Sequence, residues 1–226
     1  MAGIQPPFVT IQALPELNWA RESTRNLNPV HVGRFVIRGS HSAACKNPAL
    51  IELEIDAGPA FGTAHHATTK GCLLALSKLA PAQAPFHPLD VGCGAGTLAM
   101  AIARLWKVKT VASDIDPIAV RVARRNVTLN CLQRFVWCLV SDGFASPLVR
   151  ERGPFDLIVA NILQRPLCAL APSIVMNSVP GSTVVLSGLL DNQAPSIVAT
   201  YRGQGLHLKN RFSIDGWTTL IMVRPQ

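Results

Sequence analysis

Apolar and polar positions from about residue 64 onward change repeatedly between helical and strand spacing. The stretch from Thr68 to Leu79 places Cys72, Leu73 and Leu76 on one face, as an amphipathic helix does. The proline-rich segment PAQAPFHP ends this predicted helix. The chain continues as short apolar runs separated by amphipathic stretches of helical length.

The predicted elements of this region alternate between strands and helices. Strands are expected at 89–91, 109–113, 135–140, 156–160, 183–187, 206–213 and 217–223, and helices at 97–106, 117–129, 166–176 and 194–204. The tight turn Asp215-Gly216 joins the last two strands, which makes them antiparallel. Strands that alternate with helices need crossover connections, so the pattern predicts a doubly wound parallel α/β sheet with helices on both faces.

Residues 1–60 show a mixed pattern of short strands, one helix and turn-rich connectors. Strands are expected at 7–11, 34–38 and 50–55, and an amphipathic helix that carries Trp19 at 15–27. The chain is therefore expected to divide into a short α/β N-terminal appendage, residues 1–60, and a main domain, residues 61–226.

Composition supports a folded domain, because 49% of the residues are hydrophobic and only 15% are charged. No apolar stretch is long enough to span a bilayer, and the start MAGIQPPFV lacks the pattern of a signal peptide. We therefore expect a cytoplasmic protein without a membrane partner. The net charge of +8 speeds encounters with acidic partners, but no RNA-binding signature is present, so no direct nucleic-acid contact is required.

The cysteines and histidines give no metal-binding pattern. The six cysteines form no CxxC pair and several lie in apolar segments, which predicts buried free thiols. His65 and His66 have no cysteine or carboxylate at ligand spacing, so no metal site is expected.

The strongest chemical signal is a glycine loop after the first strand of the main domain. The segment DVGCGAG begins at Asp90 and contains Gly92, Gly94 and Gly96, which let the backbone turn sharply and approach a ligand. The dinucleotide pattern GxGxxG would need glycine where Thr97 stands. The spacing DxGxGxG instead suits a ligand without pyrophosphate and with an amino-acid moiety. Asp90 could contact the ammonium group of that ligand, or order the loop by accepting backbone N–H bonds.

Two more polar side chains stand at strand ends. Asp114, 22 residues after Gly92, is placed to accept both ribose hydroxyls of a nucleoside, although NAD(P) remains an alternative ligand here. Asp116 is better interpreted as the N-cap of the helix that starts at Pro117. Asn161 ends the fourth strand of the sheet, beside the first, where an amide can orient an attacking amine; a strand-end cap is the alternative.

Longer segments resemble the ribosomal protein L-eleven (L11) methyltransferases (PrmA). AFGTAHHATT, residues 60–69, is similar to the family signature AFGTGxHxTT, with Ala64 in place of a glycine. Segments 90–96, 113–117, 160–163 and 186–190 with Gln193 match the family in the same order. Asn18-Trp19 and residues 28–37 resemble its interdomain region.

The resemblance implies the class I S-adenosyl-methionine-dependent methyltransferase fold, a Rossmann-like seven-stranded sheet whose last strand is antiparallel. It implies an enzyme that transfers methyl groups from S-adenosyl-L-methionine to lysine side chains and the N-terminal amine of ribosomal protein L11. Family members have a longer, ferredoxin-like N-terminal domain that docks the substrate, so residues 1–60 are expected to be a remnant of that region and a linker. The family's cofactor-binding positions fall on Thr69, Gly92, Asp114 and Asn161.

Each candidate site residue has an expected role. Asn161 is the expected catalytic residue, because it would orient the amine. Thr69, at the start of its helix, would hold the methionine end of the cofactor, whose carboxylate the helix N-terminus favours. Asp142, after the next strand, could accept a bond from the adenine amino group or only form a turn. A loop-ordering role is favoured for His65 and His66.

Three other functions are alternatives to this one. A methyltransferase for another protein amine keeps the cofactor site, whereas the glutamine-directed branch favours an NPPY motif that Asn161-Ile162-Leu163 does not match. An NAD(P)-dependent oxidoreductase would need GxGxxG. A non-catalytic module of the same fold remains open.

Overall fold

The computed structural model of the 226-residue chain describes residues 28–45, 47–56, 66–81 and 83–226. The elements predicted at 7–11 and 15–27, with Trp19, lie outside these residues. His65, Ala64 and the expected domain boundary near residue 60 also lie outside them.

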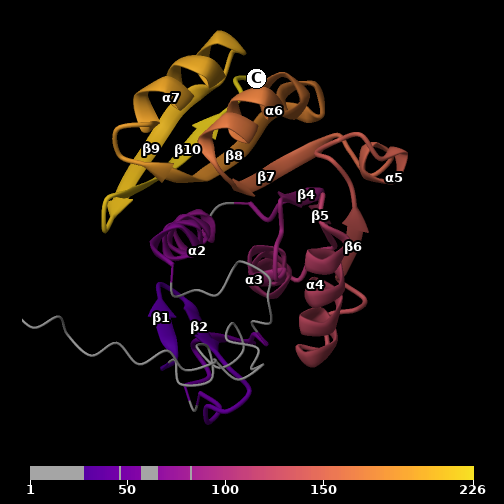
Figure 1. Cartoon of the computed structure of the whole chain (residues 1–226). Coiled ribbons are helices and arrows are strands. Elements are labelled where there is room, and N and C mark those ends of the chain that lie inside the picture. Colours follow the sequence, from indigo (N-terminus) through magenta and orange to yellow (C-terminus); the bar gives the residue numbers. More distant parts are fainter. Residues whose placement is uncertain (1–27, 46, 57–65, 82) are drawn as a thin grey trace, which may run out of the picture.

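Seven strands form one sheet in the order β6-β5-β4-β7-β8-β10-β9 (Figure 1). Their bounds are β4 Pro88–Val91, β5 Thr110–Asp114, β6 Val136–Val140, β7 Phe155–Asn161, β8 Ser178–Leu190, β9 His207–Ile214 and β10 Trp217–Val223. Strands β4 to β8 pair in parallel, and β10 runs antiparallel between β8 and β9. The predicted doubly wound sheet with an antiparallel last strand is therefore confirmed.

Helices cover both faces of this sheet (Figure 1). They are α2 Ala67–Leu79, α3 Thr97–Trp106, α4 Pro117–Leu129, the one-turn α5 Pro147–Arg150, α6 Gln164–Met176 and α7 Ala194–Gly203. Strand side chains alternate between the two faces, so Leu157 and Val159 of β7 join the core under α2, α3 and α4, whereas Ile158 and Ala160 join the core under α6 and α7. No helix in the described ranges is long and apolar enough to cross a membrane.

A second, three-stranded sheet consists of β1 Val30–Val32, β2 Phe35–Arg38 and β3 Ile51–Glu54. Strands β1 and β2 are antiparallel, and β2 and β3 are parallel. Phe35, Ile37 and Leu53 are buried in the same apolar core as α2 and α3. The small sheet therefore packs directly against the elements that carry the glycine loop.

Several boundaries differ from the sequence prediction for local reasons. Strand β8 covers 13 residues rather than five. It begins at Ser178, which pairs with Phe155 before an irregularity in the register, and it continues to Leu190, which pairs with Trp217. Helix α6 begins two residues before Pro166, which is tolerated in the first helical turn. The short β1 and α5 were not predicted, because elements of three or four residues are too short to show a periodic pattern of apolar positions.

Candidate functional site

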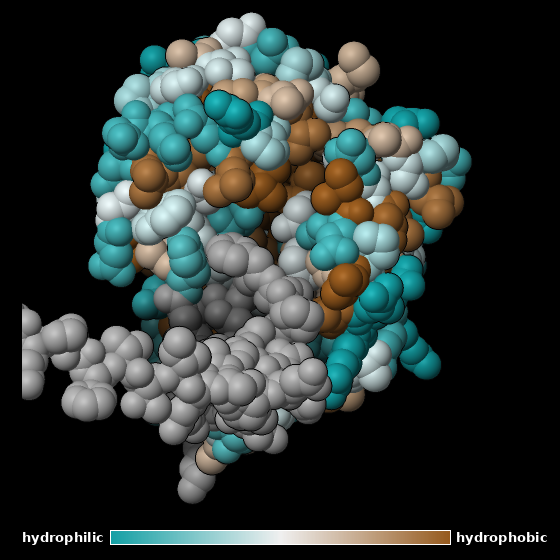
Figure 2. All heavy atoms as spheres, viewed as in Figure 1, coloured by the Kyte–Doolittle hydropathy of each residue, from teal (hydrophilic) through white to brown (hydrophobic). Residues whose placement is uncertain are grey.

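A cavity of about 700 Å³ opens at the carboxyl ends of β4, β5 and β7, where the strand order reverses. Six of the eight predicted site residues line it: Thr69, Gly92, Gly94, Asp114, Asp142 and Asn161. Figure 2, which views the molecule from the same side as Figure 1, shows hydrophobic side chains gathered across the middle of the surface. Ile115 and Leu163, which line the cavity, are 65% and 69% exposed. A mostly apolar cavity with a few polar groups is typical of a small-molecule site.

The glycine loop forms one wall of the cavity. The backbone N–H groups of Gly92 and Cys93 both donate to the Ser113 carbonyl, at 2.8 and 2.9 Å, which fixes the loop to the end of β5. Gly92 has a φ of 71°, and a Cβ there would lie 2.4 Å from Ile162 Cγ2. Only glycine meets both conditions, so the loop can approach a ligand closely at this point.

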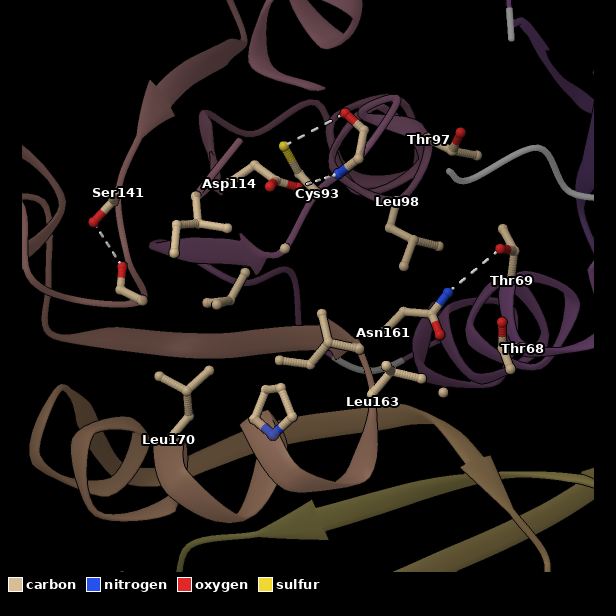
Figure 3. A pocket seen from close by; sticks show the side chains of 18 of the residues that line it. Thr68, Thr69, Cys93, Thr97, Leu98, Asp114, Ser141, Asn161, Leu163 and Leu170 are labelled. Atoms are coloured by element: carbon tan, nitrogen blue, oxygen red, sulfur yellow. Dashed lines mark hydrogen bonds between the residues drawn. The ribbon is translucent and has the colours of Figure 1, made fainter. Parts of the chain in front are cut away.

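Asp114 lies beside the glycine loop, at the end of β5 (Figure 3). Its Oδ2 accepts a bond from the Gly94 N–H at 2.8 Å, and its Oδ1 accepts one from the Asp116 N–H at 3.0 Å. Each carboxylate oxygen keeps a further acceptor site, and the side chain lines the cavity. Asp116 caps α4 by accepting from the Ile118 N–H at 2.7 Å, as predicted. Asp114 is therefore held in place and can accept two hydroxyl groups.

Asn161 projects from the end of β7 toward α2, away from Asp114 (Figure 3). Its Nδ2 donates to Thr69 Oγ1 at 3.4 Å. Its Oδ1 is buried and has no partner among the described residues. Leaving such an acceptor unpaired costs about 1–3 kcal/mol, and an N–H donor in the cavity would remove that cost. The unpaired oxygen thus favours the amine-orienting role over a strand-end cap.

His66, at the start of α2, and Trp217, at the start of β10, also line the cavity. His66 caps the helix, because its Nδ1 lies 2.8 Å from Thr68 Oγ1 and accepts from the Thr68 N–H at 3.3 Å. The His66 ring also packs edge-on against Trp217 at 4.7 Å between centroids. This geometry agrees with the loop-ordering role. Trp217 was not predicted as a site residue, since an aromatic first residue of a strand looks like any core position.

Asp142 lies after β6, on the far side of the glycine loop from Asn161. It is exposed, and its backbone carbonyl accepts the Ala145 N–H at 2.9 Å in a turn. The adjacent Ser141 hydroxyl donates to the Gly143 carbonyl at 2.8 Å. The turn role is therefore visible, and the carboxylate remains available to the cavity. Among the described residues, no group of three or more His, Cys, Asp or Glu side chains is arranged to hold a metal ion.

Asp90 and Gly96 do not line the cavity. Asp90 is completely buried on the other face of β4 from Leu89 and Val91, and its Oδ2 accepts from the Ala99 N–H of α3 at 2.9 Å. Its Oδ1 has no partner in the described structure. The bond that the structure shows is thus to α3, the helix that follows the loop, and Asp90 does not line the cavity; its contact with a ligand's ammonium group and its ordering of the loop both stay predictions. Burial raises the pKa of Asp90 to about 7, and the nearby Asp114 charge adds to this.

The raised pKa of Asp90 predicts a pH-dependent stability that Asp90→Asn should abolish. Between the usual carboxyl pKa of 3.8 and about 7, the unfolded chain releases a proton that the folded protein keeps. The free energy of unfolding therefore falls as pH rises through this window, by roughly 4 kcal/mol from this group. Urea unfolding without cofactor at pH 4.5 and 8 should show the variant gaining stability relative to wild type at the higher pH. An equal difference at both pH values would contradict the assignment.

Comparison with known sequences finds the family that the sequence motifs resemble, and the match extends over nearly the whole chain. The family model described as Ribosomal protein L11 methyltransferase (PrmA) matches residues 2–225. A Brucella suis protein named Ribosomal protein L11 methyltransferase is 42% identical over 219 residues, which are 97% of this chain and 77% of that protein. A protein of the same name from a Chelativorans strain is 44% identical over 216 residues, 96% of this chain and 74% of that one.

Solved structures agree with this match. The ribosomal protein L11 methylase of Lactobacillus delbrueckii superposes with a TM-score of 0.79 at 25% identity, over 88% of this chain and all of that one. An RNA methyltransferase from Salinibacter ruber, in complex with S-adenosyl-L-homocysteine, gives a TM-score of 0.55 at 19% identity, over 68% of this chain and 90% of that one. The second likeness shows the fold alone. The large sheet is therefore the class I, Rossmann-like methyltransferase sheet, as expected.

Proposed function

The chain belongs to the ribosomal protein L11 methyltransferase (PrmA) family, and from this premise we propose that it methylates amino groups of ribosomal protein L11. S-adenosyl-methionine is the cofactor, and the acceptors are lysine side chains and the N-terminal amine. A ribosomal protein as substrate also favours a cytoplasmic location. The observation that carries the choice of an amine acceptor is the buried, unpaired Oδ1 of Asn161 on the cavity wall.

The two sides of the cavity suit the two ends of this reaction. Asp114 offers its remaining lone pairs to the ribose hydroxyls, and Gly92 and Gly94 allow close approach of the cofactor. We assign Thr69, at the start of α2, to the methionine carboxylate and Asp142, which lines the cavity after β6, to the adenine amino group. Six of the eight predicted site residues therefore line one cavity, and Asn161 is proposed to lie at its methionine end.

Asn161 is proposed to orient the acceptor amine. The cofactor supplies a methyl group that its sulfonium already activates, so the protein contributes mainly alignment. A neutral amine donates an N–H to Asn161 Oδ1, and its lone pair can then point into the cavity. A free lysine has a pKa of about 10.4, and the largely apolar cavity favours the neutral form. The amine loses its proton to solvent after transfer.

The proposal predicts methyl transfer to one ribosomal protein in particular. Incubation of the full chain with labelled S-adenosyl-methionine and purified ribosomal protein L11 should place label on L11, and peptide mass spectrometry should locate it on lysines and the N-terminal amine. Acetylated L11, in which these amines are blocked, is the control and should stay unlabelled.

Two outcomes would count against the proposal at different levels. Label on another ribosomal protein but not on L11 would overturn the substrate and leave the chemistry. Absence of calorimetric binding of S-adenosyl-homocysteine at millimolar concentration would overturn the methyltransferase assignment itself.

A further inference from the structure

Asn126 lies inside α4 and is completely buried. Its Nδ2 donates to the Ala95 carbonyl at 2.9 Å, and its Oδ1 accepts from the Asp56 N–H at 3.0 Å. The two partners lie 31 and 70 residues away along the chain. Asparagine is a poorer helix former than alanine or leucine, so helix stability does not explain this residue. Its amide is instead satisfied at both ends by backbone groups of two separate segments.

The Ala95 carbonyl belongs to a peptide unit in the glycine loop. The N–H of the same unit, at Gly96, donates to the Cys93 carbonyl at 2.8 Å. The preceding Gly94 N–H donates to Asp114 Oδ2 at 2.8 Å. Cys93, Gly94 and Asp114 all line the cavity. The peptide unit that Asn126 holds is therefore bonded directly to Cys93, a residue of the cavity wall.

The other end of the Asn126 amide holds the chain as it leaves the small sheet. Asp56 follows β3 by two residues and precedes segment 57–65. The Asp56 carboxylate also forms an ion pair with Arg125 of α4, at 2.9 Å. One side chain thus connects the exit of the small sheet with the glycine loop.

We propose, on the basis of the proposed function, that Asn126 is a positioning residue that fixes the glycine loop for cofactor binding by bracing it against the exit of the small sheet. Its contribution falls on cofactor affinity rather than on methyl transfer, because Asn161 and Thr69 form the other end of the cavity.

Asn130, one turn further along at the end of α4, provides a matched control. It is also buried, and its amide clamps Glu54 of β3, accepting from the Glu54 N–H at 2.9 Å and donating to the Glu54 carbonyl at 2.7 Å. It makes no hydrogen bond to the glycine loop. Loss of either amide removes a buried clamp on the small sheet, but only Asn126 touches the loop.

The test compares Asn126→Ala with Asn130→Ala in the full chain. Calorimetry should show the Kd for S-adenosyl-homocysteine rising about tenfold in the first variant and no more than about twofold in the second, since one loop hydrogen bond is lost. Thermal unfolding should show both variants losing stability to a similar degree. In L11 methylation, Asn126→Ala should raise the KM for the cofactor and leave kcat within about twofold of wild type.

Equal Kd values for both variants, whether raised or unchanged, would overturn the inference, and so would a fall in kcat without a change in KM. If either alanine variant fails to fold, Asn126→Leu and Asn130→Leu replace the pair, because leucine keeps the volume and favours the helix. Failure of the wild-type protein to bind S-adenosyl-homocysteine would instead overturn the proposed function.

Discussion

Asn161→Ala is expected to lower kcat for methyl transfer by about 10²-fold or more, because it removes the group that aligns the amine with the methyl carbon. The Oδ1 acceptor is buried and unpaired, so no other described side chain competes for it. The cofactor Kd should rise far less than kcat falls, since Asp114 and the glycine loop are untouched. Steady-state kinetics with L11, together with calorimetry of S-adenosyl-homocysteine, separates the two effects.

Asn177→Ala is the matched control for this prediction. Asn177 follows α6, its side-chain Nδ2 donates to the Ser173 carbonyl at 2.8 Å, and it does not line the cavity. The control should keep kcat within about twofold of wild type, as expected for a residue outside the site. If Asn161→Ala retained full kcat, the amine would have to be oriented by another group, and the catalytic role proposed for Asn161 would be wrong.

Most of the large sheet could be predicted because its strands and helices have clear periods. The helices at 97–106 and 117–129 and the strand at 217–223 have the predicted bounds. Strand β7 is buried on both faces from Leu157 to Ala160, so these four residues appear in the sequence as an apolar run. Strand β8 was predicted too short, because pairing partners rather than local sequence decide where a strand ends.

The site was predictable where it depends on chain order alone. The carboxyl ends of parallel strands share one edge, so the glycine loop, Asp114 and Asn161 had to meet there. Trp217 reaches the same edge because β10 is antiparallel to β8 and begins where β8 ends, with Trp217 opposite Leu190. That register depends on a tertiary pairing that no local pattern contains.

The position of Asp90 follows from strand alternation. Asp90 precedes the loop by only two residues, but its side chain must take the opposite face of β4 from Val91, toward α3. Its closeness to the loop in the sequence suggested that it lines the site. The alternation of side chains along β4 instead directs it toward α3, outside the cavity. Its part in cofactor binding would be exerted through the position of α3.

Asp114→Ala is expected to raise the Kd for S-adenosyl-methionine by about 10²-fold or more, because two hydroxyl bonds to a charged acceptor are lost. The variant also removes the acceptor of the Gly94 N–H, which holds the glycine loop. Calorimetry with S-adenosyl-homocysteine measures the affinity directly. Single-turnover transfer at saturating cofactor should recover most of the wild-type rate, since Asn161 still aligns the amine.

Asp116→Asn is the control that distinguishes the Asp114 carboxylate from the nearby start of α4 as the cause of a lost affinity. Asp116 lies two residues away and does not line the cavity, and its carboxylate accepts the capping bond from the Ile118 N–H. Asparagine caps a helix about as well as aspartate, so α4 and the cofactor Kd should remain close to wild type. Equal losses of affinity in the two variants would mean that the start of α4, rather than the Asp114 carboxylate, controls binding. An unchanged Kd in Asp114→Ala would contradict the proposed contact between Asp114 and the ribose. The nucleoside would then have to bind to a part of the cavity other than the end of β5.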